Sequence, residues 1–164
     1  AGNSYAKGGK EPLVTIIEFS EFQCPFCTRV GTTLNKIEKA YGDKVRIVFK
    51  HNPLPFHKDA PLAAQAAIAA GEQGKFWEMH DKLFANQRAL EDADLKKYAT
   101  ELGLDMAKFD AALAAQTGKD LVAKDMDLAT KVNARGTPNF FVNGRNLRGA
   151  VPFEDFDALI EEAL

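Results

Sequence analysis

The chain has 164 residues, of which 46% are hydrophobic and 27% charged, a composition typical of globular rather than disordered or fibrous proteins. At this length one domain can bury a full core without metals or disulfides as staples. The formal net charge of −2 gives no basic surface for nucleic acid or an anionic membrane, and neither is expected as a partner.

Two strands with a helix between them are predicted near the N-terminus. LVTIIEF at 13–19 is rich in β-branched and aromatic residues, typical of a strand covered on both faces. KVRIVFKH at 44–51 predicts a second strand. Apolar residues at helical spacing predict a helix from Cys24 to near Gly42. Its expected inward face consists of Val30, Leu34, Ile37 and Tyr41. AKGGKEP at 6–12 is too weak a strand pattern to add.

The pattern is helical between 58 and 133, where five segments follow one another. NFFVNGRNLRG at 139–149 predicts two short strands around an Asn-Gly pair, which suits the positive φ angles of a type I′ hairpin turn. A last helix is expected after Pro152. This order predicts an α/β, thioredoxin-like fold as a single domain over residues 1–164, with a helical insertion at about 58–133.

The only two cysteines, Cys24 and Cys27, directly follow the first predicted strand. A zinc site needs four ligands, and the histidines do not follow the pair at the usual spacing, so no metal is expected. These histidines are His51, His57 and His80. A structural disulfide closing so short a loop removes only about 2 kcal/mol of unfolded-state entropy, which a domain with a full core does not need. The third interpretation is a pair that exchanges electrons.

The position of the pair supports exchange. A sulfur in the first turn of a helix meets unpaired backbone N–H groups and the positive end of the helix dipole, which favour the thiolate. Cys24 is therefore the expected nucleophile, open to solvent. Pro25 suits the first turn because it lacks an N–H. Cys27 lies one turn further, shielded, where it can attack a mixed disulfide formed at Cys24. No metal or organic cofactor is implied.

Three motifs carry a family resemblance. IIEFSEFQCPFC at 16–27, FWEMHDKLF at 76–84 and GTPNFFVNG at 136–144 resemble the DsbA family of thioredoxin-fold thiol-disulfide oxidoreductases. The resemblance covers the chain from about Val14 to the end. It implies that Cys24 attacks and accepts and that Cys27 resolves.

The residues between the cysteines tune the thiolate in that family. Pro25 matches the best-known member, whereas Phe26 stands where that protein has histidine. Phe26 can neither donate a hydrogen bond to the sulfur nor carry charge, so we expect a less stabilised Cys24 thiolate and a milder oxidant. Pro25 and Phe26 are both expected to face the substrate.

Thr137 and Pro138 match the family's cis-proline loop, which packs against the cysteines and pairs with the backbone of an incoming peptide. Without the cysteines, an ordinary turn with a trans proline is the simpler interpretation. With them, a cis bend that exposes a docking edge explains the proline better, so both residues are expected at the substrate site.

Glu18 interrupts an otherwise apolar strand, and a buried carboxylate needs a partner or a raised pKa. Lys50, at the end of the second predicted strand, is the expected partner. The strand pattern fits a solvated strand end equally well. The resemblance favours burial, because family members carry an acid here beneath the cysteines and a lysine near Lys50, and it makes a proton-shuttling role plausible.

Several aromatic residues and one histidine have simpler interpretations. FWEMH at 76–80 predicts core packing of the insertion, with His80 as a structural histidine rather than a ligand. Phe22, Phe26 and Phe56 are candidates for an apolar rim that binds unfolded peptides, or equally for core positions.

The expected function is a thiol-disulfide oxidoreductase that introduces disulfides into substrate proteins through Cys24 and Cys27. The resemblance implies a periplasmic or otherwise extracytoplasmic location in a bacterium. Its partners would be reduced or unfolded substrate proteins and a membrane reoxidant of the DsbB or VKOR type.

Two alternatives remain. The first is an isomerase or reductase; such relatives usually oligomerise through an N-terminal arm, and about a dozen residues precede the first strand here, so a monomeric oxidase is expected. The second is a redox-inert binding module, or the soluble domain of a larger or membrane-fused protein.

Overall fold

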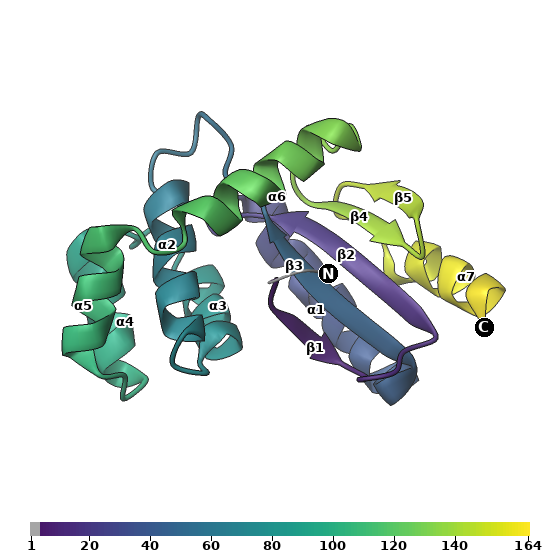
Figure 1. Cartoon of the computed structure of the whole chain (residues 1–164). Helices are drawn as coiled ribbons and strands as arrows, with labels where there is room; N and C mark the ends of the chain where they lie inside the picture. The colour runs from purple at the N-terminus through teal and green to yellow at the C-terminus, as the bar shows by residue number, and fades with distance from the viewer. Residues whose placement is uncertain (1–3) are drawn as a thin grey trace.

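The apolar run after residue 13 forms β2 (Val14–Ser20), the central strand of a five-stranded sheet. It pairs in parallel with β3 (Val45–His51) and antiparallel with β4 (Asn139–Val142). Beyond β4 lies β5 (Arg145–Arg148), and the strand order is β1-β3-β2-β4-β5. This computed structural model describes residues 4–164 (Figure 1).

The outer strand β1 (Ala6–Gly8) lies in the segment whose strand pattern is weak, and it pairs antiparallel with β3. Its backbone approaches the start of β3 so closely that only glycine fits. Gly8 has a φ of 101°, and a Cβ there would lie 2.3 Å from the Val45 carbonyl oxygen. A Cβ on Gly9 would lie 1.9 Å from the Asp43 carbonyl oxygen. Tertiary pairing, rather than local propensity, therefore forms this strand.

The two faces of the sheet have different covers. One face packs against α1 (Pro25–Tyr41) and α7 (Phe153–Ala163), with Ile16 and Ile47 in that core. The other face packs through Phe19 against α6 (Lys119–Lys131). A 3₁₀ turn (Gly42–Lys44) joins α1 to β3. The helix predicted from Cys24 to near Gly42 and the helix predicted after Pro152 are both confirmed.

The predicted helical insertion forms five helices. They are α2 (Ala60–Gly71), α3 (Phe76–Ala85), α4 (Asp92–Glu101), α5 (Met106–Ala115) and α6. Figure 1 shows α2 to α5 grouped beside the sheet, with α6 running from that group across to the sheet. Their core is continuous with Phe22 and Phe49 of the sheet region, so the insertion packs directly against the active-site end.

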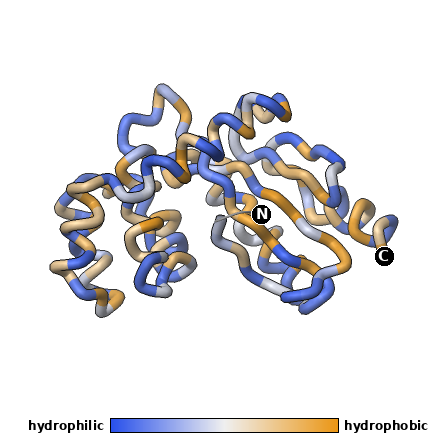
Figure 2. The backbone as a smooth tube through the Cα atoms, in the orientation of Figure 1, coloured by the Kyte–Doolittle hydropathy of each residue, from blue (hydrophilic) through white to orange (hydrophobic). Residues whose placement is uncertain are grey.

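The β4–β5 hairpin has the predicted Asn-Gly turn. Asn143 and Gly144 have φ angles of 46° and 86°. The Asn143 amide also holds the hairpin to β2, because its Oδ1 accepts from the Thr15 N–H at 2.8 Å. Figure 2 shows a hydrophobic stretch along β2, whereas the helices of the insertion alternate between the two colours. Within residues 4–164 no helix is long and apolar enough to cross a bilayer.

Candidate active site

The structure places Cys24 at the junction between β2 and α1. Cys24 is the N-cap residue of α1 and Pro25 is its first residue. In its protonated form the Cys24 thiol donates to the Thr137 carbonyl oxygen at 3.4 Å, across 113 positions of sequence. The Thr137–Pro138 peptide bond is cis. The cysteine pair and the proline loop therefore meet in one site.

The two sulfurs have opposite acidities. A hydrogen bond from Cys27, supported by Thr137 and by backbone N–H groups at the helix start, outweighs burial and lowers the pKa of Cys24 to about 6. Burial, together with the hydrogen bond and negative charge of Cys24, raises the pKa of Cys27 far above its ordinary value. Cys24 is therefore the thiolate at neutral pH, and Cys27 holds its proton.

The expected contrast in exposure between the two cysteines is wrong. Cys24 and Cys27 are each only 2% exposed. The Thr137 carbonyl covers the Cys24 sulfur from the proline loop, a long-range contact that the local helix pattern cannot show. The asymmetry of the pair therefore comes from electrostatics and hydrogen bonding rather than from access to solvent.

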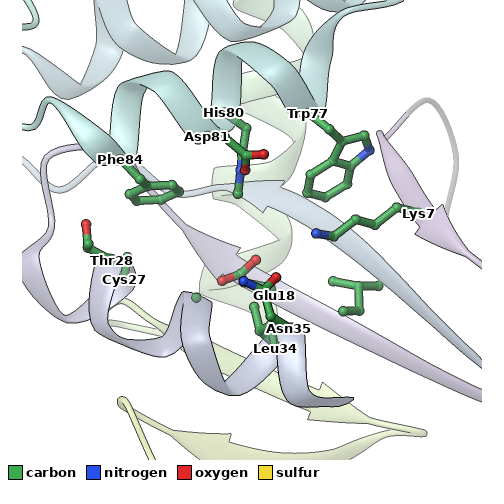
Figure 3. A pocket seen from close by; sticks show the side chains of 12 residues that line it. Lys7, Glu18, Cys27, Thr28, Leu34, Asn35, Trp77, His80, Asp81 and Phe84 are labelled. Atoms are coloured by element: carbon green, nitrogen blue, oxygen red, sulfur yellow. The ribbon is translucent and has the colours of Figure 1, made fainter. Parts of the chain in front are cut away.

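Glu18 is buried, which rules out the solvated strand end. It is 2% exposed, and its Oε1 has no hydrogen-bond partner within the described residues. Burial raises the pKa of Glu18 to about 7, against a smaller lowering by Lys7. Glu18 and Cys27 line the same cavity of about 130 Å³, with Lys7 and His80 on its other walls (Figure 3).

Lys50 is not the partner of Glu18. In the parallel register Glu18 lies beside Phe49, whereas Lys50 lies beside Phe19. Because side chains alternate across a strand, Glu18 and Lys50 occupy opposite faces of the sheet. Lys50 Nζ lies 3.6 Å from Asp125 Oδ1 on α6. The cation near Glu18 is Lys7 of β1, whose ammonium lies 4.7 Å from the Trp77 ring centroid and 3.1 Å from Glu38 Oε2.

The phenylalanine candidates separate into core and surface. Phe22 is fully buried and stacks on Phe49, with ring centroids 5.4 Å apart. Phe26 and Phe56 are 52% and 76% exposed. The Arg29 guanidinium lies 5.0 Å from the centroid of the Phe26 ring, which places a positive charge beside the helix start.

The surroundings of His80 agree with the prediction of a structural histidine. His80 packs edge-on against Phe49 and Phe84, and its Nδ1 lies 2.9 Å from Asp81 Oδ1. Burial lowers the pKa of His80. In the described part of the chain no three His, Cys, Asp or Glu side chains gather closely enough to hold a metal ion.

Sequence reasoning missed the residues that hold the active-site loop. Gln87, just beyond α3, donates its amide to the carbonyls of Phe22 and Cys24, at 2.9 and 2.8 Å. On the other side of the site, Asn52 donates to the Ala134 carbonyl at 3.2 Å and so supports the proline loop. These amides lie far from the cysteines in sequence and carry no motif, so no pattern indicates them.

A family model described as thioredoxin matches residues 1–162. The chain belongs to the thioredoxin family. A thioredoxin-like oxidoreductase from Silicibacter pomeroyi is 28% identical, with a TM-score of 0.87 over 99% of this chain and 93% of that one. BdbD from Bacillus subtilis is 26% identical, with a TM-score of 0.84 over 98% and 92% of the two chains. By family, fold and cysteine pair the chain is a DsbA-like thioredoxin-fold oxidoreductase.

Two further relatives resemble this chain only in part, one in fold and the other over part of its own length. The thiol-disulfide exchange protein alpha-DsbA2 from Wolbachia pipientis shares the fold at a TM-score of 0.89 and 16% identity over 99% of this chain and 88% of that one. The Na⁺/H⁺ antiporter NhaA 3 of Salinispora tropica is 41% identical over 160 residues, 97% of this chain but 24% of the antiporter. The chain thus spans about a quarter of the length of the curated relatives that it matches.

Proposed function

We propose that this domain introduces disulfides into substrate proteins. The observation that carries the proposal is the opposite acidity of the two thiols, with the pKa of Cys24 near 6 and that of Cys27 raised, beside the proline loop. A low pKa makes Cys24 both a good leaving group and a stable product, which favours the reduced form of the domain and therefore oxidation of the substrate.

The exchange proceeds in two steps. A substrate thiolate attacks Cys24 of the oxidised pair; the new Cys24–substrate bond forms, the Cys24–Cys27 bond breaks, and Cys27 leaves and takes a proton. A second substrate thiolate then attacks the substrate sulfur and releases Cys24 as a thiolate. Two electrons pass to the domain. Glu18 is positioned through the shared cavity to give or take the Cys27 proton, since its pKa is near neutrality.

The substrate segment docks beside the cis-proline loop. Thr137 and Pro138 present an edge next to the Cys24 sulfur, and the exposed Phe26 adds apolar surface at the helix start. Pro25 fixes the first turn of α1 and so holds Cys24 in place. Lys50 supports the site indirectly, through Asp125 of α6.

We place the domain outside the cytoplasm, where a membrane reoxidant of the DsbB or VKOR type returns Cys24 and Cys27 to the disulfide. A neighbour at 27% identity and a TM-score of 0.78, over 98% of this chain and 89% of that one, is described as a periplasmic thioredoxin-like protein from Salmonella enterica, which supports the location. We further propose that the domain acts as a monomer.

A second candidate rests on the NhaA relatives, of which this chain matches only a part. In this alternative the domain is a module of a larger membrane protein, and its cysteine pair is inert or regulatory. The reduction potential of the Cys24–Cys27 couple separates the candidates. A value below about −300 mV, typical of stable structural disulfides, favours the module, and a more oxidising value favours the exchange enzyme.

Single-cysteine variants test the mechanism directly. In Cys27→Ser the Cys24 thiolate can attack a disulfide of a substrate protein; the Cys24–substrate bond forms, the substrate disulfide breaks and one substrate thiolate leaves. No Cys27 is present to break the new bond, so covalent complexes should accumulate on non-reducing gels. Cys24→Ser should trap almost none, because the Cys27 thiol holds its proton at neutral pH. Equal trapping by both variants, or by neither, would contradict the mechanism.

A further inference from the structure

A groove lies along the proline loop. It has a volume of about 440 Å³ and is formed by the loop that precedes β4 and by the end of β5. Thr137 lines it, and the Thr137 carbonyl is 3.4 Å from the Cys24 sulfur. A substrate segment whose cysteine reacts at Cys24 therefore places its neighbouring residues in this groove.

The charged side chains that line the groove are all positive. Its lining includes two exposed arginines, Arg135 and Arg148, and no aspartate or glutamate. Among the described residues neither arginine forms an ion pair. Two other arginines are engaged elsewhere: Arg145 lies 2.6 Å from Glu162, and Arg46 donates to the Gly9 carbonyl at 2.8 Å. Two positive charges in a groove that shares Thr137 with the Cys24 site are unexpected in a chain with a net charge of −2.

Arg148 is held in place. Its Nε donates to Asn146 Oδ1 at 3.0 Å, and the Asn146 amide in turn donates to the Phe140 carbonyl at 3.0 Å. The guanidinium is thus anchored through one nitrogen, and its two terminal nitrogens keep donors for a ligand. A fixed fork of this kind suits a carboxylate, which accepts two parallel hydrogen bonds.

We propose that this groove selects substrate segments with acidic side chains within a few residues of the reacting cysteine. The inference rests on the proposed function and names the substrate class of that same site. Arg135 and Arg148 are specificity-determining residues; they bind the carboxylates of the segment while its cysteine exchanges at Cys24.

The test uses two short peptides with one central cysteine, which differ only in two glutamates or two glutamines placed two and three residues from it. With the peptide in excess, one peptide thiolate attacks Cys24 and a second then attacks the peptide sulfur and releases Cys24, so reduction of the oxidised domain is followed by mass spectrometry at low salt. The glutamate peptide should react about fivefold faster, and Arg135→Gln/Arg148→Gln should bring the two rates to within about twofold. For each peptide, the rate with wild type is divided by the rate with the double variant, so that the intrinsic reactivity of the peptide cancels.

Two controls isolate the groove. Arg145→Gln, on the same strand but paired with Glu162, should leave the preference intact. Sodium chloride at 1 M should remove it, because charges are then screened within about 3 Å. The glutamine peptide should react equally with wild type and the double variant. Equal rates for both peptides in the wild type, or a preference that survives the double substitution, would refute the selection alone. Failure of both peptides to react would refute the proposed function and this inference with it.

Discussion

At Glu18 the fold holds a carboxyl group where its ionisation is costly. The side chain lies in the middle of β2, on the face covered by α1, and shares its cavity with Cys27 and Lys7. Burial is the main cause of its raised pKa, and Lys7 only partly offsets it. The result is a group that takes up and releases a proton near neutral pH, next to a thiol that must do the same.

Because ionisation of Glu18 is unfavourable in the folded state, the free energy of unfolding depends on pH. The pKa of Glu18 is about 7 in the folded state, above the value of 4.5 for an unperturbed glutamate. The folded state therefore binds the proton more tightly, and its stability falls as pH rises from 4.5 through 7. Glu18→Gln removes the titrating group and with it this loss of stability. The free energy of unfolding of the variant, relative to that of wild type, should therefore rise by about 3 kcal/mol between pH 4.5 and pH 8.

Urea titrations at several pH values measure this difference. Glu11→Gln, which alters an exposed carboxylate, should show no such trend. The same Glu18→Gln variant should exchange disulfides more slowly near neutral pH, because Cys27 loses its proton carrier. A constant difference in stability across the pH range would mean that Glu18 does not titrate as a buried group.

At the scale of elements, Gln87 is one of the residues through which the insertion holds the active-site loop; Asp59, whose N–H donates to Gln23, is another. Gln87, in the connection between α3 and α4, bonds to two carbonyls that flank the start of α1. Without it these two carbonyls lose their hydrogen-bond partner from the insertion. The insertion thus stabilises the cysteine pair as well as covering it.

Gln87→Ala should lower the free energy of unfolding by about 1–2 kcal/mol and speed amide hydrogen exchange over residues 22–27. Asn86→Ala is the matched control, since that neighbouring amide donates to the Lys82 carbonyl at the end of α3 rather than to the active-site loop. It should leave protection at 22–27 unchanged. Equal loss of protection in both variants would mean that the helix end, not the Gln87 amide, supports the loop.

The same elements show what a sequence can predict. Local patterns were sufficient for β2, α1 and the hairpin, because periodicity, helix-start chemistry and an Asn-Gly turn act within a few residues. For the same reason they were sufficient to place Cys24 and Cys27 at the start of α1, although not to predict that both are buried. They failed for β1, for Gln87 and for the partner of Glu18, because each depends on register or on contacts between distant segments. The strand pattern leaves the burial of Glu18 open, and only the sheet register shows which lysine lies on its face of the sheet.

At the scale of the whole molecule, two buried groups give stability opposite dependences on pH. His51 is 1% exposed, and its two ring nitrogens have no hydrogen-bond partner within the described residues. Burial, with smaller effects from His80 and Lys50, lowers the pKa of His51 from 6.5 to about 3. Unfolding then takes up a proton, so stability is lost as pH falls from 6.5 towards 3. The contribution of Glu18 to stability has the opposite dependence, since it falls as pH rises from 4.5 to 7. Between pH 4.5 and pH 6.5, where both groups contribute, the two effects nearly cancel.

Replacing Glu18 should therefore make the effect of His51 on the pH dependence of stability measurable. In a Glu18→Gln background, stability should fall steadily below pH 6.5, with a contribution from His51 of up to about 5 kcal/mol by pH 3. Adding His51→Phe, which keeps an aromatic ring among Phe22, Phe49 and Phe76, should remove that contribution. Urea titrations of the single and double variants from pH 7 to pH 3.5 measure the difference, in which all other titrating groups cancel. His51→Leu in the same background guards against a packing effect of the larger ring. If both double variants follow the acid profile of Glu18→Gln alone, then His51 is not the group whose protonation unfolds the domain.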